Sequence, residues 1–331
     1  MIRIGRTAIA ITLLLAGSAF AQQQPPASPA APPPVDFSKV EIKTTDLGDN
    51  VYMLEGQILG SIGGNITVAV GKAGIIMVDG QFAPLHDKIK AAISTISNLP
   101  IKYLINTHYH GDHTGGNEGF AKDGAVIVSD INVKNRLAEG TTNGLTGAKT
   151  PPAAAGALPS KTYAGKMFKI RLPGRVADLR HIANAHTDGD TYVWFKTANV
   201  LATGDTFTNG RYPNIDFANG GNIRGMIAAT DAYIKLINAK SRIVPGHGPI
   251  ADKAALTEYR AMLVTARDRM AALVKQGKSE DDEVAAKPFA DLDKKWAPTE
   301  LASKNFIRVV YHSLADKTDR KTVLKQMLRR G

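Results

Sequence analysis

The chain has 331 residues, of which 44% are hydrophobic and 21% charged, so it is long and apolar enough to bury the core of a globular domain. It contains no cysteine, which excludes disulfide bonds and thiolate chemistry. The formal net charge is +11, which is one feature of nucleic-acid-binding proteins. Lysine and arginine are scattered among acidic residues, however, so we interpret the excess as general surface charge and expect no nucleic-acid partner.

The N-terminus has the three parts of a secretory signal peptide. Met1–Arg6 is basic, Ala8–Ala16 is almost wholly apolar, and Ala19-Phe20-Ala21 is an Ala-x-Ala cleavage site. The apolar run is too short to span a membrane, and no cysteine follows the cleavage site to carry a lipid. We therefore predict a signal peptide over residues 1–21 and a soluble mature protein that is periplasmic or secreted, without stable membrane anchoring.

Residues 22–36, rich in Gln, Ala and Pro, have the composition of a disordered linker. After them, short apolar runs predict strands, in chain order, at Val51–Leu54, Asn65–Val70, Ile75–Val78, Lys102–Asn106 and Ala125–Ser129. A helix is expected over Pro84–Ile96, because Ile89 and Ile93 recur at helical spacing and Pro84 suits a first turn.

The second half of the sequence repeats this arrangement. Strands are predicted at Met167–Leu172, Val176–Ile182, Thr191–Phe195, Val200–Thr203 and Arg242–Val244. A helix is predicted over Gly225–Ile237. Strand-rich halves with interspersed helices indicate two packed sheets with helices on the outside.

The C-terminal part is predicted to be helical. Apolar residues at helical spacing run from Leu256 to Leu273, and this helix is expected to end at Gly277. A second helix over Leu301–Leu314 follows an acidic linker at Glu280–Glu283.

These elements predict a main domain over residues 37–275 and a C-terminal helical extension, residues 276–331, packed on it. The apolar residues Phe306, Val309 and Val310 of the extension either cover the domain or form a dimer contact, so a monomer and a homodimer both stay open.

The run Thr107–His113 places three imidazoles and a carboxylate directly after a predicted strand. His108 and His110, two apart in extended backbone, point to the same side and can reach one ion. Asp112 and His113 lie on the following turn and can serve a second ion. Imidazole nitrogen and carboxylate oxygen are ligands that Zn²⁺ prefers. A histidine-rich surface loop is the alternative, but three of the 8 histidines of the chain lie here.

Further candidate ligands follow other predicted strands. His186, Asp205 and His247 each come after an apolar run, and a turn or glycine lies beside each of them. Polar side chains in a core cost several kcal/mol unless they are paired. Repetition of this pattern at three strand ends therefore indicates a metal site rather than packing.

The motif His-x-His-x-Asp-His, followed by a histidine, an acidic residue and a final histidine, resembles the metallo-β-lactamase-fold hydrolases over about Asn50 to Glu258. Matching segments are Gly-Gly-Asn at 115–117, Ala-His-Thr-Asp at 185–188, Thr-Gly-Asp at 203–205 and Pro-Gly-His-Gly at 245–248. The resemblance implies an α/β (α+β) fold, the four-layer αββα sandwich, with residues 37–275 as the catalytic domain.

The resemblance also implies a ligand set for two metal ions, with zinc expected and iron or manganese left open. The first metal would be held by His108, His110 and His186, the second by Asp112, His113 and His247, and Asp205 would bridge both. Asp79 follows the apolar strand Ile75–Val78. It would form hydrogen bonds with the Thr107–His113 run, which we call the metal loop.

Such a site implies hydrolysis of a small-molecule substrate. A hydroxide shared by the two metals would attack a carbonyl group, with no covalent intermediate on the protein. Asp112 would orient that hydroxide, which makes it a candidate catalytic residue as well as a ligand.

The sequence is less informative about the substrate. The segment containing Asn222 resembles the cysteine-containing zinc β-lactamases, in which an asparagine helps to bind the lactam carbonyl. Those enzymes have cysteine where this chain has Asp205, and a carboxylate-binding lysine where it has Thr208. Arg211 or Arg224 can replace that lysine, or either is a surface residue.

Modest β-lactam hydrolysis is therefore the first interpretation, and lactone or thioester hydrolysis, as in glyoxalase II, is the alternative. Phosphodiesterases, sulfatases and mononuclear-iron oxygenases stay open within the fold, as does a binding protein without turnover. The loops 57–64 and 140–159 either border the substrate cleft or merely connect elements.

The remaining polar candidates have plain interpretations. His86, His181 and His312 are interpreted as histidines outside the site. Asp188 and Asp190 either support His186 or fill a turn.

Overall fold

The computed structural model describes residues 35–58 and 60–314. The predicted signal peptide and nearly all of the predicted linker lie outside the described residues. Within the described ranges, none of the helices is long and apolar enough to cross a membrane.

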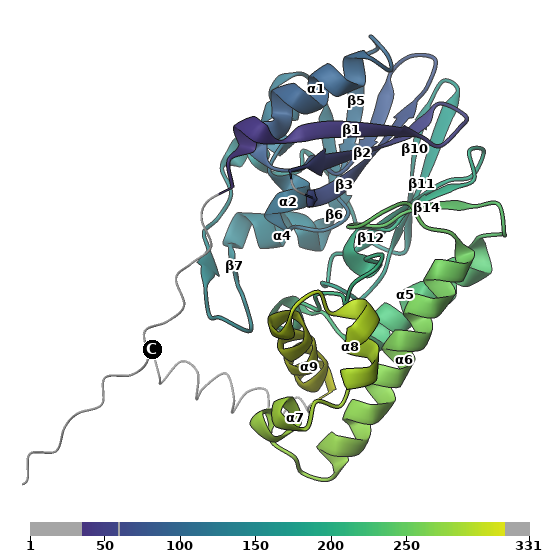
Figure 1. Ribbon diagram of the computed structural model, residues 1–331. Helices are drawn as coiled ribbons and strands as arrows, with labels where there is room; N and C mark the ends of the chain where they lie inside the picture. Colours follow the sequence, from purple (N-terminus) through teal and green to yellow (C-terminus); the bar gives the residue numbers. More distant parts are fainter. Residues whose placement is uncertain (1–34, 59, 315–331) are drawn as a thin grey trace, which may run out of the picture. The chain divides into compact units, whose positions relative to one another are not determined.

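Two β-sheets form the centre of the fold (Figure 1). The first has seven strands in the spatial order β1-β2-β3-β4-β5-β6-β9. Their bounds are β1 Glu41–Asp46, β2 Val51–Gln57, β3 Ser61–Val70, β4 Ile75–Val78, β5 Ile101–Ile105, β6 Val126–Asp130 and β9 Lys161–Tyr163. Strands β1 to β4 pair antiparallel, whereas β4, β5, β6 and β9 run parallel, so the last residues of β4 and β5 lie at the same edge.

The second sheet has five strands in the order β10-β11-β12-β13-β14. Their bounds are β10 Met167–Leu172, β11 Arg175–His181, β12 Thr191–Phe195, β13 Val200–Ala202 and β14 Arg242–Val244. Only the β13–β14 pair is parallel. A small separate hairpin joins β7 (Thr141–Thr142) to β8 (Lys149–Thr150).

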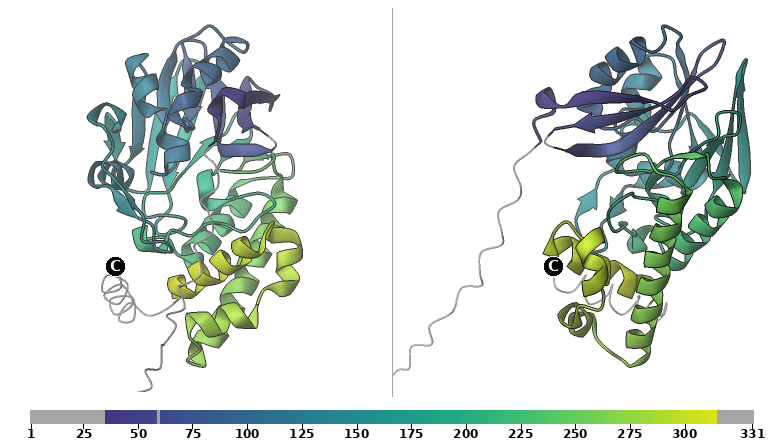
Figure 2. Two further views of the ribbon diagram at one scale, coloured as in Figure 1. Left: turned by 60° about the vertical axis from the view of Figure 1, so that its left-hand side comes forward. Right: turned by 45° about the vertical axis from the view of Figure 1, so that its right-hand side comes forward.

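Helices cover the outer faces of these sheets. The α-helices are α1 His86–Ser94, α2 Gly111–Thr114, α3 Asn117–Lys122, α4 Ile131–Glu139, α5 Ile223–Leu236, α6 Lys253–Lys275, α7 Glu280–Ala286, α8 Ala290–Trp296 and α9 Glu300–Leu314. Short 3-10 helices are η1 Phe37–Lys39, η2 Ala83–Leu85, η3 Ala155–Ala157, η4 Gly204–Thr206 and η5 Phe217–Asn219. Figure 2 shows the yellow-green helices α7 to α9 gathered beside the long green helix α6.

Three apolar clusters hold the layers together. One lies between the two sheets and includes Ile105 of the first and Phe195 of the second. Another joins the outer face of the first sheet to α1 and α3 through Ile89 and Phe120. The third joins the second sheet to α5, α6, α8 and α9, with Tyr259 fully buried in it. Full burial of an apolar side chain such as Ile89 or Phe120 contributes about 1.5 to 3 kcal/mol. The predicted αββα order of layers is confirmed.

Most predicted elements agree with the structure because their apolar residues mark buried strands or one face of a helix. Ile75–Val78, Met167–Leu172, Thr191–Phe195 and Arg242–Val244 match residue for residue. The others differ by a few residues at their ends. The domain boundary at residue 275 stays a prediction.

Three predictions about connecting segments were wrong. Glu280–Glu283 is the first turn of α7, not a linker, and Ser279 caps that helix through a reciprocal bond with Asp282. The 140–159 segment was predicted as a loop but contains the β7–β8 hairpin and η3. The 57–64 segment was also predicted as a loop, but most of it belongs to β2 and β3. The mostly exposed edge strand β1 was not predicted.

Candidate metal centre

All seven candidate ligands come from segments that follow strands at one edge of the two sheets. The Thr107–His113 run follows β5, and its last residues form α2. His186 lies between β11 and β12, Asp205 lies in η4 directly after β13, and His247 follows β14. Backbone hydrogen bonds join these segments, including Thr191 N to Thr107 O and Gly246 N to Gly204 O. The strand ends that carry the candidate ligands therefore lie together in a single region.

One group consists of His108, His110, His186 and Asp205, whose potential ligand atoms lie within 4.8 Å of one another. His110 Nδ1 lies 3.1 Å from His108 Nε2 and 2.9 Å from His186 Nε2. Asp205 Oδ2 is 3.8 Å from His186 Nε2 and 4.0 Å from His108 Nε2. We call these residues the three-histidine group.

The second group consists of Asp112, His113 and His247. His247 Nε2 lies 3.3 Å from Asp112 Oδ2 and 3.2 Å from Asp205 Oδ2. Asp205 Oδ1 lies 3.1 Å from His113 Nε2. The carboxylate of Asp205 therefore faces both groups, and this is the arrangement that a bridging ligand requires.

Within residues 35–58 and 60–314, two buried polar atoms of this region have no hydrogen-bond partner, namely His113 Nε2 and Asp205 Oδ1. Leaving such atoms unsatisfied costs about 1 to 3 kcal/mol each, unless a further group lies between them. Imidazole nitrogen and carboxylate oxygen together are a donor set suited to a divalent metal ion. The residues present therefore fit metal ions in both groups.

The electrostatics of the region agree with this fit. Burial and the neighbouring His113 hold the pKa of His108 well below its ordinary value, and burial lowers that of His186 to about 4, so both imidazoles keep a free lone pair. Burial alone would lower the pKa of His113, but Asp205, Asp112 and Asp79 outweigh it and raise the pKa. A site that favours a proton on His113 also favours a metal cation in its place.

Asp79 supports the second group from the end of β4. Its Oδ1 accepts a hydrogen bond from Thr107 N, and its Oδ2 accepts from Thr107 Oγ1 and lies 2.8 Å from His113 Nδ1. This contact directs His113 Nε2 toward Asp205. Asp79 has a left-handed backbone, with φ of 62°. The structure thus has Asp79 in contact with the metal loop, as the resemblance implied.

Two close approaches require glycine. A Cβ at Gly64 of β3 would overlap the His113 ring, and a Cβ at Gly246 would overlap the Asp205 carboxylate. The backbones of β3 and of the segment after β14 therefore pass directly against the centre.

Asp216 is the supporting residue that the sequence analysis missed. Its Oδ2 lies 3.0 Å from His110 Nε2 and accepts a hydrogen bond from the Tyr109 hydroxyl. Burial alone would raise the pKa of Asp216, but the hydrogen bonds from His110 and Tyr109 outweigh it, and the pKa is lowered. An ionised Asp216 fixes the Nε2–H tautomer of His110 and leaves Nδ1 free for a metal.

His186 is held by its neighbours in a similar way. Its Nδ1 lies 2.7 Å from Asn214 O, and its backbone N–H donates to Asp190 Oδ2. Asp190 therefore supports His186, which was one of the two interpretations left open. Asp188 instead forms an ion pair with Arg136.

The three predicted substrate-binding residues, Asn222, Arg211 and Arg224, do not belong to either group of candidate ligands. Asn222 caps α5 by accepting from Arg224 N, and its side-chain amide donates to Ser313 O. Arg224 is exposed on the first turn of α5, and Arg211 is half-buried. Thr208 is buried, and its hydroxyl donates to Arg211 O.

The other histidines lie outside both groups, as interpreted. His86 contacts Asp87 and Asp123, and His181 contacts Asp190 O. His312 of α9 pairs with Glu280.

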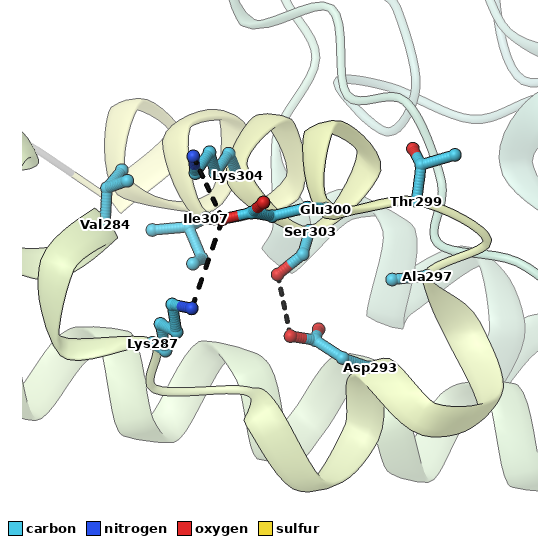
Figure 3. Close-up of a pocket in the computed structure, with 9 residues that line it drawn as sticks. All are labelled: Val284, Lys287, Asp293, Ala297, Thr299, Glu300, Ser303, Lys304 and Ile307. Carbon is cyan, nitrogen blue, oxygen red and sulfur yellow. Dashed lines mark hydrogen bonds and ion pairs between the residues drawn. The ribbon is translucent and has the colours of Figure 1, made fainter.

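A cavity of about 220 Å³ lies among the C-terminal helices (Figure 3). It is lined by Val284, Lys287, Asp293, Ala297, Thr299, Glu300, Ser303, Lys304 and Ile307. Its polar groups bond one another, since Ser303 Oγ donates to Asp293 and Lys304 Nζ lies 3.1 Å from Glu300 Oε1. None of the candidate ligands lines it, so it is separate from the metal centre.

The chain matches a known protein family over its central part. The family model described as the metallo-beta-lactamase superfamily matches residues 59–247, which is more than half of the chain.

Comparison with curated proteins finds distant relatives. The chain is 27% identical to the 2,4-dinitroanisole O-demethylase subunit alpha of Nocardioides sp. over 152 residues, which are 45% of this chain and 43% of that protein. It is 25% identical to hydroxyacylglutathione hydrolase of Nitrosococcus oceani over 201 residues, which are 60% of this chain and 66% of that protein. The chain thus spans less than two thirds of the length of these relatives.

Solved structures share the fold. A metallo-beta-lactamase from Pontibacter korlensis superposes with a TM-score of 0.55 at 18% identity, covering 68% of this chain and 99% of that one. The DIM-1 metallo-beta-lactamase gives a TM-score of 0.55 at 17% identity, with 69% and 99% covered. At this level of identity the likeness establishes the architecture alone.

Proposed function

Because the chain belongs to the metallo-β-lactamase superfamily, we propose that it is an exported dinuclear zinc hydrolase that cleaves a thioester or a lactone. The observation that carries this proposal is the position of Asp205. Its two carboxylate oxygens face different groups, with Oδ1 3.1 Å from His113 Nε2 and Oδ2 3.2 Å from His247 Nε2 and 3.8 Å from His186 Nε2. One carboxylate that reaches both groups supports two metals in one centre.

Two divalent cations in these groups would supply an activated water and polarise the scissile carbonyl group. The protein side chains supply position and proton exchange. Asp112 has a side chain 24% exposed, compared with 9% for Asp205 and 3% for Asp79. Asp112 is therefore the carboxylate best placed to take a proton from a reacting water at the open side of the centre.

The surroundings of the ligands support this choice of substrate class. Recognition of a β-lactam carboxylate calls for a fixed cation, and Thr208 is uncharged, buried and hydrogen-bonded to Arg211 O. The amide of Asn222 is already bonded to Ser313 O. The asparagine that favoured a β-lactam is thus already hydrogen-bonded, and Thr208 remains a departure from the β-lactamases. Asp205 in place of cysteine keeps its similarity to glyoxalase II.

The relatives support the same order of candidates. Hydroxyacylglutathione hydrolases match this chain over 60% and 54% of its length, and an acylglutathione is a thioester. We therefore place thioester and lactone hydrolysis first and β-lactam hydrolysis second.

A substrate panel tests the proposal. The purified chain, with its metal content measured, is assayed against an acyl thioester, a lactone, a β-lactam and a phosphodiester. We expect kcat/KM for the thioester or the lactone to exceed the β-lactam value by about tenfold or more. Faster β-lactam turnover, with KM raised about tenfold by Arg211→Ala or Arg224→Ala, would reverse this order. One iron per chain without hydrolysis would indicate an oxygenase instead.

Export is tested separately. The proposal rests on the basic, apolar and Ala-Phe-Ala segments of residues 1–21. N-terminal sequencing of fractionated cells should find a mature chain that begins near Gln22 outside the cytoplasm. Recovery of a chain that retains Met1 in the cytoplasm would reject export without affecting the metal centre.

A further inference from the structure

Residues 212–222, which we call the 212–222 segment, contact two of the three histidines of the three-histidine group. Asn214 O lies 2.7 Å from His186 Nδ1, and Asp216 Oδ2 lies 3.0 Å from His110 Nε2. Asp216 N also donates to His186 O. The ring orientations of both histidines therefore depend on where this segment lies.

The opposite side of the 212–222 segment is held by the C-terminal helices. Tyr212 stacks on Phe306 of α9 with ring centroids 4.0 Å apart, and its hydroxyl donates to Asp293 of α8. Phe217, the residue after Asp216, stacks on His312 of α9 with centroids 4.4 Å apart and planes inclined by 18°.

A third contact joins the 212–222 segment to α9. The side chain of Asn222 donates to Ser313 O at 2.7 Å. The segment is thus fixed to α8 and α9 at its first residue, in its middle and at its last residue. Figure 1 shows α8 and α9 next to each other beside α6.

The second group has different supports. His113 is oriented by Asp79 of the first sheet, and the β3 backbone at Gly64 packs against its ring. His247 follows β14 and lies beside Thr208 through a backbone bridge. Among the described residues, no hydrogen bond joins the 212–222 segment to Asp112, His113 or His247.

We propose that α9, through its ring contact between His312 and Phe217, positions the 212–222 segment and thereby sets the metal affinity of the three-histidine group but not that of the second group. His312 and Phe217 act as positioning residues, because neither touches the candidate ligands directly. The inference rests on the proposed metal centre.

The experiment measures zinc affinity by competition with a chromophoric chelator in two single-group backgrounds. His247→Ala leaves the three-histidine group intact, and His110→Ala leaves the second group intact. His312→Ala, which removes the ring, should weaken zinc binding about tenfold in the first background and less than about twofold in the second. His312→Phe keeps a ring against Phe217 and should restore the affinity.

Controls separate the ring contact from charge and from general destabilisation. Glu280→Gln removes the charged partner of His312, which lies 3.0 Å away, and should leave both affinities unchanged. Ile307→Ala truncates a buried residue of the same helix that lines the cavity of Figure 3, and it should also leave them unchanged. If His312→Ala does not fold, Phe217→Leu removes the other ring of the same pair.

An equal loss in both backgrounds, no loss in either, or an equal loss in the Ile307→Ala control would refute the positioning role. Failure of the otherwise unaltered chain to bind zinc would refute the metal centre itself. Failure of the metal centre and failure of the positioning role are distinguishable, because the first is measured on the chain without any substitution and the second on the variants.

Discussion

Asp216 lies 3.0 Å from His110 Nε2, although the two residues are 106 positions apart in the chain. Hydrogen bonds from His110 and Tyr109 outweigh burial and lower the Asp216 pKa. The carboxylate therefore orients a candidate ligand without belonging to the ligand set. Supporting contacts of this kind affect metal affinity strongly.

Asp216→Asn should weaken zinc binding by the three-histidine group by about 10-fold to 100-fold, because the charged acceptor for His110 is lost. Competition with a chelator measures the change. Asp188→Asn is the matched control, since Asp188 pairs with Arg136 nearby but does not contact His110. Equal affinities in the two variants would show that Asp216 does not orient His110.

Asp205→Ala should lower the metal content from about two ions to about one or fewer, and activity by about a hundredfold or more, since its two oxygens serve both groups. Elemental analysis of the purified variant gives the metal content. Asp231→Ala is the control, because Asp231 pairs with Arg260 and is not one of the candidate ligands. A variant that keeps two tightly bound ions would show that Asp205 is not a bridge.

Gly64→Ala should displace the His113 ring, because a Cβ at this position would lie 2.6 Å from His113 Nε2. We expect loss of about one metal ion per chain, with the three-histidine group still loaded. Gly111→Ala is the matched control in the metal loop, where a Cβ meets nothing within 4 Å. Unchanged metal content in both variants would contradict the close approach of β3.

Glu283 of α7 is buried, and neither of its carboxylate oxygens has a hydrogen-bond partner in the part of the chain that the structure describes. Burial, with a smaller effect of Asp282, raises its pKa from 4.5 to about 7. Because the folded pKa is the higher one, the stability that this group contributes is present below about pH 4.5 and is lost as the pH rises through about 7.

Glu283→Gln should therefore stabilise the protein at about pH 8 more than at about pH 5, with the difference in unfolding free energy growing by about 1 to 3 kcal/mol. Denaturant titrations at the two pH values measure it. The exposed neighbour variant Asp281→Asn should show no such growth. A pH-independent effect of Glu283→Gln would mean that the carboxyl group does not titrate in this range.

The ligand groups were predictable because each ligand sits in a short local pattern. His108 to His113 follow an apolar strand, and Asp205 and His247 sit beside glycine at strand ends. Asp216 and Asn214 lie in a segment with no such pattern, and their role arises only when the fold brings them to His110 and His186. No signal in the sequence marks that contact.

The errors in secondary structure have physical causes too. Strand β1 reads Glu-Ile-Lys-Thr-Thr-Asp and is mostly exposed at the edge of its sheet, so it lacks the apolar run by which strands were recognised. The acidic residues after Ser279 looked like a solvated linker. Ser279 with Asp282 three positions later is a capping box, and this signal of a helix start was present in the sequence.

The candidate ligands come from both sheets, with His108, His110, Asp112 and His113 following β5 of the first and His186, Asp205 and His247 lying between or after strands of the second. Metal ions held there would join the two halves of the sandwich as a cross-link. This chain has no cysteine, and coordination at that edge would give it the reinforcement that exported proteins commonly obtain from disulfides. Scarcity of metal would then lower the stability of the folded protein, and with it the resistance to proteolysis, as well as the catalytic activity.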